Sequence, residues 1–435
     1  MPKITFMGAG STVFAKNVLG DSMLTPALED ATIALYDIDG QRLEESRQML
    51  ENLNRNLGGK AKIQAYLGVE NRKDALRGAS YVVNAIQVGL YEPCTVTDFE
   101  VPKKYGLRQT IADTLGIGGI FRALRTIPVM LDFARDMEEV CPDAWFLNYT
   151  NPMAMLTGAM LKATGVKTVG LCHSVQVCAK TLLEGLGLPY DESVQWKIAG
   201  INHQAWLLEI SRDGQDLYPK IKERAAQRSD KHNDMVRYEI MKRFGYYVTE
   251  SSEHNAEYMP YFIKSKYPEL IERFNIPLDE YPRRCVNQIA KWASMRDEVL
   301  LKHDLTHERT QEYASRIMEA METNRPFKFG GNVLNTGLIP NLPEGACVEV
   351  PCIADKSGVT PTYVGPLPIQ CAAMNRTNIN VQELTIQAAL TGKKDYIYQA
   401  AMMDPHTAAE LSIDDIVSLC DDLIQAHGDW LPKYH

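Results

Sequence analysis

A cysteine and two histidines near the middle of the sequence have side chains that can bind metal ions. Cys172 and His173 follow Gly170, and His203 lies in the segment Gly200-Ile-Asn-His. A thiolate and an imidazole are common ligands of zinc and other transition metals. A structural alternative exists, because unpaired cysteine is among the residue types most often buried in a core. These three residues alone do not decide between a metal site and a packed core.

Length and composition indicate a soluble, cytoplasmic protein of about two domains. The chain has 435 residues, of which 45% are hydrophobic and 23% charged, and its formal net charge is −9. The negative charge and the lack of a basic stripe argue against a nucleic-acid partner. The first apolar run is too short for a signal peptide, and none approaches the roughly 18 residues of a membrane helix. Without a secretory signal, the nine cysteines are expected to be reduced thiols.

Short apolar runs alternate with helical patterns over the first 170 residues. Ser80–Ile86 is apolar and β-branched, as is typical of a parallel strand buried on both faces. This alternation predicts an α/β fold with a Rossmann-like, doubly wound parallel sheet over residues 1–195. Residues 196–435 predict an α+β domain, as in lactate and malate dehydrogenases. Its expected strands lie within Phe327–Gly365, and its expected helices are Ser229–Phe244, Tyr281–Leu301, Thr306–Thr323, Ile369–Leu390, Tyr396–Met403 and Ile413–His427.

A glycine-containing turn after the first strand predicts a dinucleotide site. Gly8-Ala-Gly10 follows the strand Lys3–Met7 and opens a helix, and Asp37 ends the next strand. Such glycines let the backbone approach a pyrophosphate, while the acid binds ribose hydroxyls and favours NAD over NADP. The third glycine of the usual fingerprint is absent, so a purely structural turn is the alternative. The expected cofactor-binding residues are Gly8, Gly10, Ser11, Thr12, Asp37 and Asn84.

Several longer motifs together are more specific than the glycine turn. They are Tyr91-Glu-Pro-Cys-Thr-Val-Thr-Asp98, Thr110-Ile-Ala-Asp-Thr-Leu-Gly116, Gly118-Gly-Ile-Phe-Arg-Ala-Leu-Arg-Thr-Ile-Pro128, Asn148-Tyr-Thr-Asn-Pro152, Gly170-Leu-Cys-His-Ser174, Gly200-Ile-Asn-His203, Glu250-Ser-Ser-Glu-His254 and Met402-Met-Asp-Pro-His406. With these motifs the chain resembles glycoside hydrolase family 4, the NAD- and metal-dependent glycosidases, and within it the α-galactosidases. The resemblance covers nearly the whole chain.

The resemblance implies hydrolysis of terminal α-galactosides such as melibiose by an unusual route. Most glycosidases use two carboxylates, and the NAD-dependent family is an exception. The implied steps are oxidation at C3, removal of the C2 proton, elimination of the C1–O bond, addition of water and reduction at C3. Ligand softness alone favours zinc beside a thiolate and an imidazole, whereas the resemblance implies Mn²⁺. α-Glucosidase or α-galacturonidase activity is the alternative within the family.

The resemblance also assigns roles to individual residues. It places the metal on Cys172 and His203 and makes Tyr258 the base that removes the C2 proton. An ordinary tyrosine has a pKa of about 10, so this role requires positive charge nearby. Asp113 matches a position that supports the basicity of the tyrosine, and a helix-capping role is its alternative. His173 is either the acid that protonates the leaving group or a ligand of a sugar hydroxyl.

Three further residues are expected on the substrate side. Asn148 and Asn151 flank a loop after a predicted strand, and Asn151 would bind the sugar, although Asn before Pro is also a common turn signal. Arg284 aligns with a substrate-binding arginine of related phospho-glycosidases but could instead pair with an acid. The resemblance implies a homo-oligomer, a dimer or tetramer. The rival functions are a lactate/malate-type dehydrogenase, which needs no metal, and a non-catalytic NAD sensor.

Overall fold

Six parallel strands form the N-terminal half of one continuous sheet. The computed structural model describes residues 1–301 and 304–435, without the side chains of residues 298, 299 and 301. The parallel strands lie in the order β3-β2-β1-β4-β5-β6, which is the order of a doubly wound dinucleotide-binding sheet. The predicted Rossmann-like fold is therefore confirmed. The strands are β1 (Lys3–Met7), β2 (Thr32–Asp37), β3 (Lys62–Leu67), β4 (Tyr81–Asn84), β5 (Trp145–Asn148) and β6 (Lys167–Leu171).

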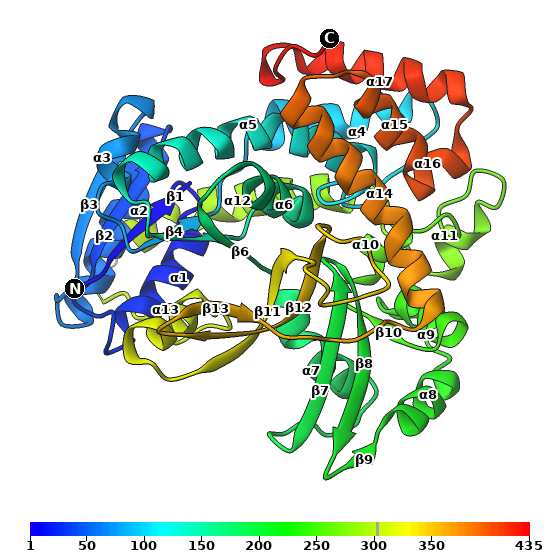
Figure 1. Ribbon diagram of the computed structural model, residues 1–435, viewed down its shortest axis with the longest axis horizontal. Helices are drawn as coiled ribbons and strands as arrows, with labels where there is room; N and C mark the ends of the chain where they lie inside the picture. Colours follow the sequence, from blue (N-terminus) through cyan, green and yellow to red (C-terminus); the bar gives the residue numbers. More distant parts are fainter. Residues whose placement is uncertain (302–303) are drawn as a thin grey trace.

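The C-terminal half extends this sheet with antiparallel strands. β11 pairs with β6, and the order continues β11-β12-β7-β8-β10. Figure 1 shows the β7–β8 hairpin extending away from the parallel strands. The strands of this half are β7 (Val194–Ile201), β8 (Gln204–Arg212), β9 (Gln215–Asp216), β10 (Tyr247–Val248), β11 (Phe327–Leu334), β12 (Cys347–Asp355) and β13 (Gly358–Pro361).

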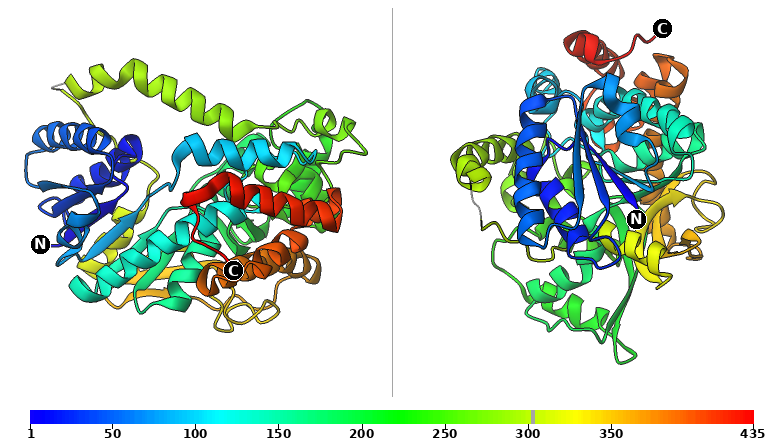
Figure 2. Two further views of the ribbon diagram at one scale, coloured as in Figure 1. Left: turned by 90° about the horizontal axis from the view of Figure 1, so that it is seen from above. Right: turned by 90° about the vertical axis from the view of Figure 1, so that its left-hand side faces the viewer.

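Helices cover the sheet, and one of them connects distant parts of the chain. Figure 2 shows α12 along the outer side of the molecule. On this helix Trp292 and Arg296 bond to Glu45 of α2. The helices are α1 (Thr12–Met23), α2 (Gly40–Asn56), α3 (Arg72–Leu76), α4 (Val96–Lys103), α5 (Gly116–Val140), α6 (Met153–Ala163), α7 (His173–Gly185), α8 (Tyr218–Gln227), α9 (Met235–Phe244), α10 (Ser252–Glu257), α11 (Glu269–Arg273), α12 (Glu280–Leu301), α13 (Ala314–Thr323), α14 (Ile369–Thr391), α15 (Asp395–Met403), α16 (Pro405–Glu410) and α17 (Ile413–His427).

Two predicted helices begin later than expected, and some elements were not predicted. The expected helix from Ser229 begins at Met235, and the one from Thr306 begins at Ala314. The segment before Ala314 is not helical because the buried carboxylate of Asp21 binds the backbone N–H and hydroxyl of Thr310. Helices α7 and α8 and the β7–β8 hairpin had no clear sequence signal.

All nine cysteines are buried and none forms a disulfide. No helix among the described residues is long and apolar enough to cross a membrane.

Candidate active site

A cavity of about 420 Å³ opens at the carboxyl ends of the parallel strands. Its wall includes Ala85, Ile86 and Gln87 after β4, Asn151 after β5, and Cys172 and His173 after β6. Ligands of doubly wound sheets bind at this edge. The opposite wall comes from the second half of the chain and includes His203, Glu250, His254 and Tyr281.

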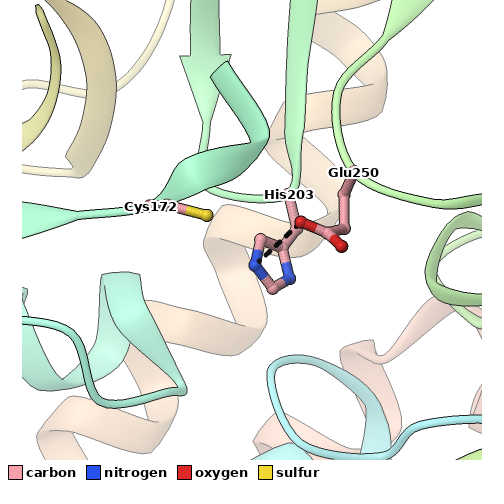
Figure 3. A group of neighbouring side chains, drawn as sticks. All are labelled: Cys172, His203 and Glu250. Carbon is pink, nitrogen blue, oxygen red and sulfur yellow. Dashed lines mark ion pairs between the residues drawn. The ribbon is translucent and has the colours of Figure 1, made fainter. Parts of the chain in front are cut away.

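Three potential metal ligands meet in this cavity. Cys172 directly precedes α7, His203 lies in the β7–β8 turn, and Glu250 follows β10 (Figure 3). Their ligand atoms all lie within 4.8 Å of one another. His203 and Glu250 have positive φ angles of 62° and 65°, a conformation that non-glycine residues adopt rarely and mainly at functional sites. The structure thus brings together the two predicted ligands and adds Glu250, which the sequence analysis missed.

The electrostatics of this group favour a cation. Glu250 Oε2 lies 3.4 Å from His203 Nε2. Burial alone would lower the pKa of His203, but the adjacent Glu250 and Cys172 raise it to about 10. No described residue donates a hydrogen bond to Glu250, whose direct ion pairs are with His203 and His254. Burial alone would raise the pKa of Glu250, but His203, His254 and the more distant Arg237 lower it. A thiol, an imidazole and a carboxylate in contact fit a divalent transition metal.

The predicted base Tyr258 contacts His203, one of the three potential metal ligands. Its side chain is fully buried, and its hydroxyl is 3.0 Å from Nδ1 of His203. Burial, with a smaller effect of Asp113, raises the pKa of Tyr258 well above its ordinary value. Tyr258 is not part of the cavity wall, whereas Tyr281 is. A hydrogen bond to the second nitrogen of a metal-binding histidine fixes the orientation of its ring.

Asp113 lies in the cavity wall and is held there by its neighbours. Its carboxylate is 3.7 Å from Nε2 of His254 and accepts a hydrogen bond of 2.8 Å from Thr114. The preceding turn is fixed by Glu257, whose carboxylate accepts backbone N–H bonds from Thr110 and Ala112 at 2.8 Å. Burial raises the pKa of Glu257 to about 7.

His173 begins α7 and faces the cavity, but it is not one of the three clustered ligands. Its Nε2 lies 2.6 Å from the buried carboxylate of Glu312, and its ring stacks on Tyr149. Burial alone would lower the pKa of His173, but Glu312 raises it. This position fits both predicted roles, proton donor and sugar ligand. Glu312 carried no recognisable sequence signal.

The glycine turn has the shape that a dinucleotide needs. Gly8 has φ +86°, and a Cβ there would lie 2.8 Å from the Ala85 carbonyl oxygen. Gly10 N–H donates to the Asp37 carboxylate at 2.6 Å, next to the first turn of α1 with Ser11 and Thr12. These close contacts tolerate only glycine and leave the helix N-terminus open to a pyrophosphate.

Like Tyr258 and the residues of the glycine turn, three further predicted residues lie outside the cavity wall. Asn84 and Asn148 are fully buried and bonded to each other at 2.9 Å. Arg284 is 45% exposed and forms ion pairs with Glu253 and Glu280, so it takes the structural alternative considered for it. The predicted residues that do line the cavity are Asp113, Asn151, Cys172, His173 and His203.

Comparison with known proteins identifies the family. The profile of family 4 glycosyl hydrolases matches residues 3–188, and that of their C-terminal domain matches residues 198–407. The chain is 66% identical to an alpha-galactosidase of Bacillus subtilis over the full length of both proteins. It is 34% identical to an alpha-galactosidase of Rhizobium meliloti, over 99% of this chain and 89% of that one. The chain belongs to glycoside hydrolase family 4 and is therefore a glycosidase.

Solved structures agree with this assignment at the level of the fold. A 6-phospho-alpha-glucosidase from gut microorganisms, in complex with NAD and Mn²⁺, matches over the full length of both chains with a TM-score of 0.83 at 18% identity. Malate dehydrogenase of Plasmodium falciparum matches 91% of this chain, and all of that chain, with a TM-score of 0.52 at 15% identity. The expected likeness to malate dehydrogenase is thus a likeness of fold.

Proposed function

We propose that this glycosidase is an α-galactosidase that hydrolyses terminal α-galactosides such as melibiose. The identity of 66% to an alpha-galactosidase over the whole chain carries this conclusion. The α-glucosidase and α-galacturonidase alternatives rest on relatives of only 26–28% identity. A lactate/malate-type dehydrogenase has no use for the group of Cys172, His203 and Glu250.

The proposed activity requires NAD and a divalent metal, with Mn²⁺ the expected ion. Cys172, His203 and Glu250 would hold the metal. The cofactor would bind the turn from Gly8 to Thr12, with Asp37 and Asn84 nearby. When bound, NAD⁺ accepts a hydride from the sugar and the metal polarises sugar oxygens, which together make the C2 hydrogen acidic. The relative that binds NAD and Mn²⁺ supports this choice of cofactors.

The residues of the chain then have to move two protons. A base removes the proton at C2, and Tyr258 remains the predicted residue, with Tyr281 as a second candidate because it lines the cavity. His173 Nε2, paired with Glu312, is in a position to protonate the leaving oxygen. Asp113 would act on the base electrostatically, since burial raises the pKa values of both tyrosines and the charge of Asp113 raises them further.

We further propose that the two predicted domains have different roles. Residues 1–195 would bind the cofactor, and residues 196–435 would supply most metal and substrate contacts and the surfaces of a homo-oligomer. Arg284 would serve the structure rather than the sugar, because both of its ion pairs are formed within the chain.

Hydrolysis of p-nitrophenyl α-galactoside tests this function. The expected result is nitrophenol release that depends on added NAD⁺, Mn²⁺ and a reducing agent, and that stops on chelation. Net NADH would not accumulate, because the cofactor is regenerated in each turnover. Full activity after removal of both NAD and metal would contradict the proposal, as would hydrolysis of α-glucosides in preference to α-galactosides.

A further inference from the structure

A buried arginine in the cavity wall has no direct ion pair with an acid among the described residues. Arg122 of α5 is only 7% exposed and lines the cavity. Its Nε donates to the carbonyl oxygen of Asn151 at 3.2 Å, and its Nη1 lies 3.4 Å from the hydroxyl of Tyr281. Among the described residues no carboxylate forms an ion pair with it. One turn later, Arg125 shows the usual arrangement, with two hydrogen bonds to the Asp98 carboxylate.

The N–H groups of Arg122 are not all used within the described part of the chain. Burial alone would lower the pKa of Arg122, but the cation–π contact with Tyr281, at 5.6 Å from the ring centroid, and the more distant carboxylates of Asp113 and Asp98 keep it charged. None of these carboxylates accepts a hydrogen bond from its guanidinium among the described residues. A guanidinium has five N–H donors, and the hydrogen bonds of Arg122 among the described residues use only Nε and Nη1. The Nη2 group is therefore available to a ligand in the cavity.

The neighbouring Asn151 also has unused hydrogen-bonding capacity. Its side-chain oxygen is buried without a partner, and its amide makes no hydrogen bond among the described residues. Asn151 lines the same cavity as Arg122 and is tied to it through its backbone carbonyl. The pair thus offers donors and an acceptor side by side. A hydroxyl group both donates and accepts, so it satisfies both residues at once.

We propose that Arg122 and Asn151 together bind one galactosyl hydroxyl, at C4 or C6, and that this contact determines sugar specificity. The inference rests on the proposed α-galactosidase function. In that reaction C1 to C3 are the reacting carbons and belong near Cys172, His203 and Glu250. No contact among the described residues joins Arg122 to any of these three. This placement takes Tyr258 and not Tyr281 as the base at C2, because Tyr281 lies 3.4 Å from Arg122. The hydroxyls left for Arg122 are then those at C4 and C6.

Deoxy substrates test this subsite directly. The kcat/KM values of wild type, Arg122→Lys and Asn151→Ala would be measured on p-nitrophenyl α-galactoside and on its 4-deoxy and 6-deoxy analogues. Wild type should prefer the full substrate over one of the two analogues by about ten- to a hundredfold, as expected for a hydrogen bond to a charged group. Both variants should lose the preference over that analogue, at the same carbon in each case. Their selectivity against the other deoxy analogue should equal that of wild type. Arg122→Lys keeps the positive charge but lacks the planar guanidinium. A lost preference in this variant therefore reports on the hydrogen-bond geometry and not on the charge.

Arg135 of the same helix provides a matched control for Arg122. Arg135→Lys, on an exposed face of the same helix, should keep both preferences, because Arg135 lies outside the cavity wall and, in the part of the chain that the structure describes, pairs with Asp132 alone. The affinities for NAD and Mn²⁺, measured by calorimetry, should be unchanged in Arg122→Lys. An equal loss of kcat/KM on all three substrates would overturn the subsite, as would weaker NAD binding with unchanged preferences. Failure of wild type to hydrolyse any α-galactoside would instead overturn the underlying function.

Discussion

Glu250 is a buried carboxylate whose role is visible only in three dimensions. Cys172 and His203 could be predicted as ligands, because their residue types are uncommon and their motifs match the family. Glu250 is one of 55 acidic residues, and nothing local distinguishes it from the nearby Glu253. In the folded chain, Glu250 faces His203, while Glu253 pairs with Arg284 at the surface.

Metal affinity should therefore depend on Glu250. We expect Glu250→Gln to weaken Mn²⁺ binding by at least about tenfold. Even the mutation of a residue that only hydrogen-bonds to a metal ligand weakens metal binding by about this factor. Cys172→Ser should lose more affinity, and both variants should keep NAD binding. Glu253→Gln is the matched control and should bind Mn²⁺ as wild type does, by isothermal titration. Unchanged affinity in Glu250→Gln would remove this residue from the ligand set.

Two tyrosines are candidates for the base that removes the C2 proton. Tyr258 bonds to His203 Nδ1, and Tyr281 lies in the cavity wall beside Arg122. If Tyr258 is the base, Tyr258→Phe should stop exchange of solvent deuterium into C2 with little change in metal affinity. If it only orients His203, the same variant should weaken Mn²⁺ binding and slow all steps. In that case Tyr281→Phe is the variant that should abolish exchange with metal affinity intact.

At the scale of elements, the parallel half of the sheet was predictable and the β7–β8 hairpin was not. Buried parallel strands are uninterrupted apolar runs, so β1, β2 and β4 are evident in the sequence. The hairpin turn instead carries Asn202 and His203, with His203 at positive φ, where a turn would usually signal itself by glycine. A candidate metal ligand, His203, thus occupies a position where a glycine would have marked the turn in the sequence.

The turn before Asp113 makes stability depend on pH through Glu257. Burial raises the pKa of Glu257 to about 7 in the folded protein, from 4.5. Between these values the folded state holds a proton that the unfolded state has released, so stability falls as pH rises through this window. The shift corresponds to roughly 3 kcal/mol. The Tm of Glu257→Gln relative to wild type should therefore be higher at pH 8 than at pH 5.

A control removes general effects of charge from this comparison. Glu239→Gln replaces a carboxylate of α9 that pairs with Arg243 near the surface. Its Tm difference from wild type should be similar at the two pH values. The same pH-independence in Glu257→Gln would show that Glu257 is ionised throughout and would contradict the raised pKa.

At the scale of the whole molecule, the active site exists only where the two halves of the chain meet. The first half supplies Asn151, Cys172 and His173, and the second supplies His203 and Glu250. The motifs match individual residues to positions of the family, but they do not show which of these residues line the cavity. The resemblance predicts Tyr258 as the base and Arg284 as a substrate ligand, but neither lines the cavity, while Arg122 and Tyr281 were found only from the folded chain.

Exchange at C2 tests the central claim, that this site removes a proton from C2 with the help of NAD and a metal. Wild type would hydrolyse an α-galactoside in D₂O, and the galactose product would be analysed by NMR for deuterium at C2. The account predicts deuterium at C2 only when NAD⁺ and Mn²⁺ are both present. Galactose released under these conditions without deuterium at C2 would contradict it.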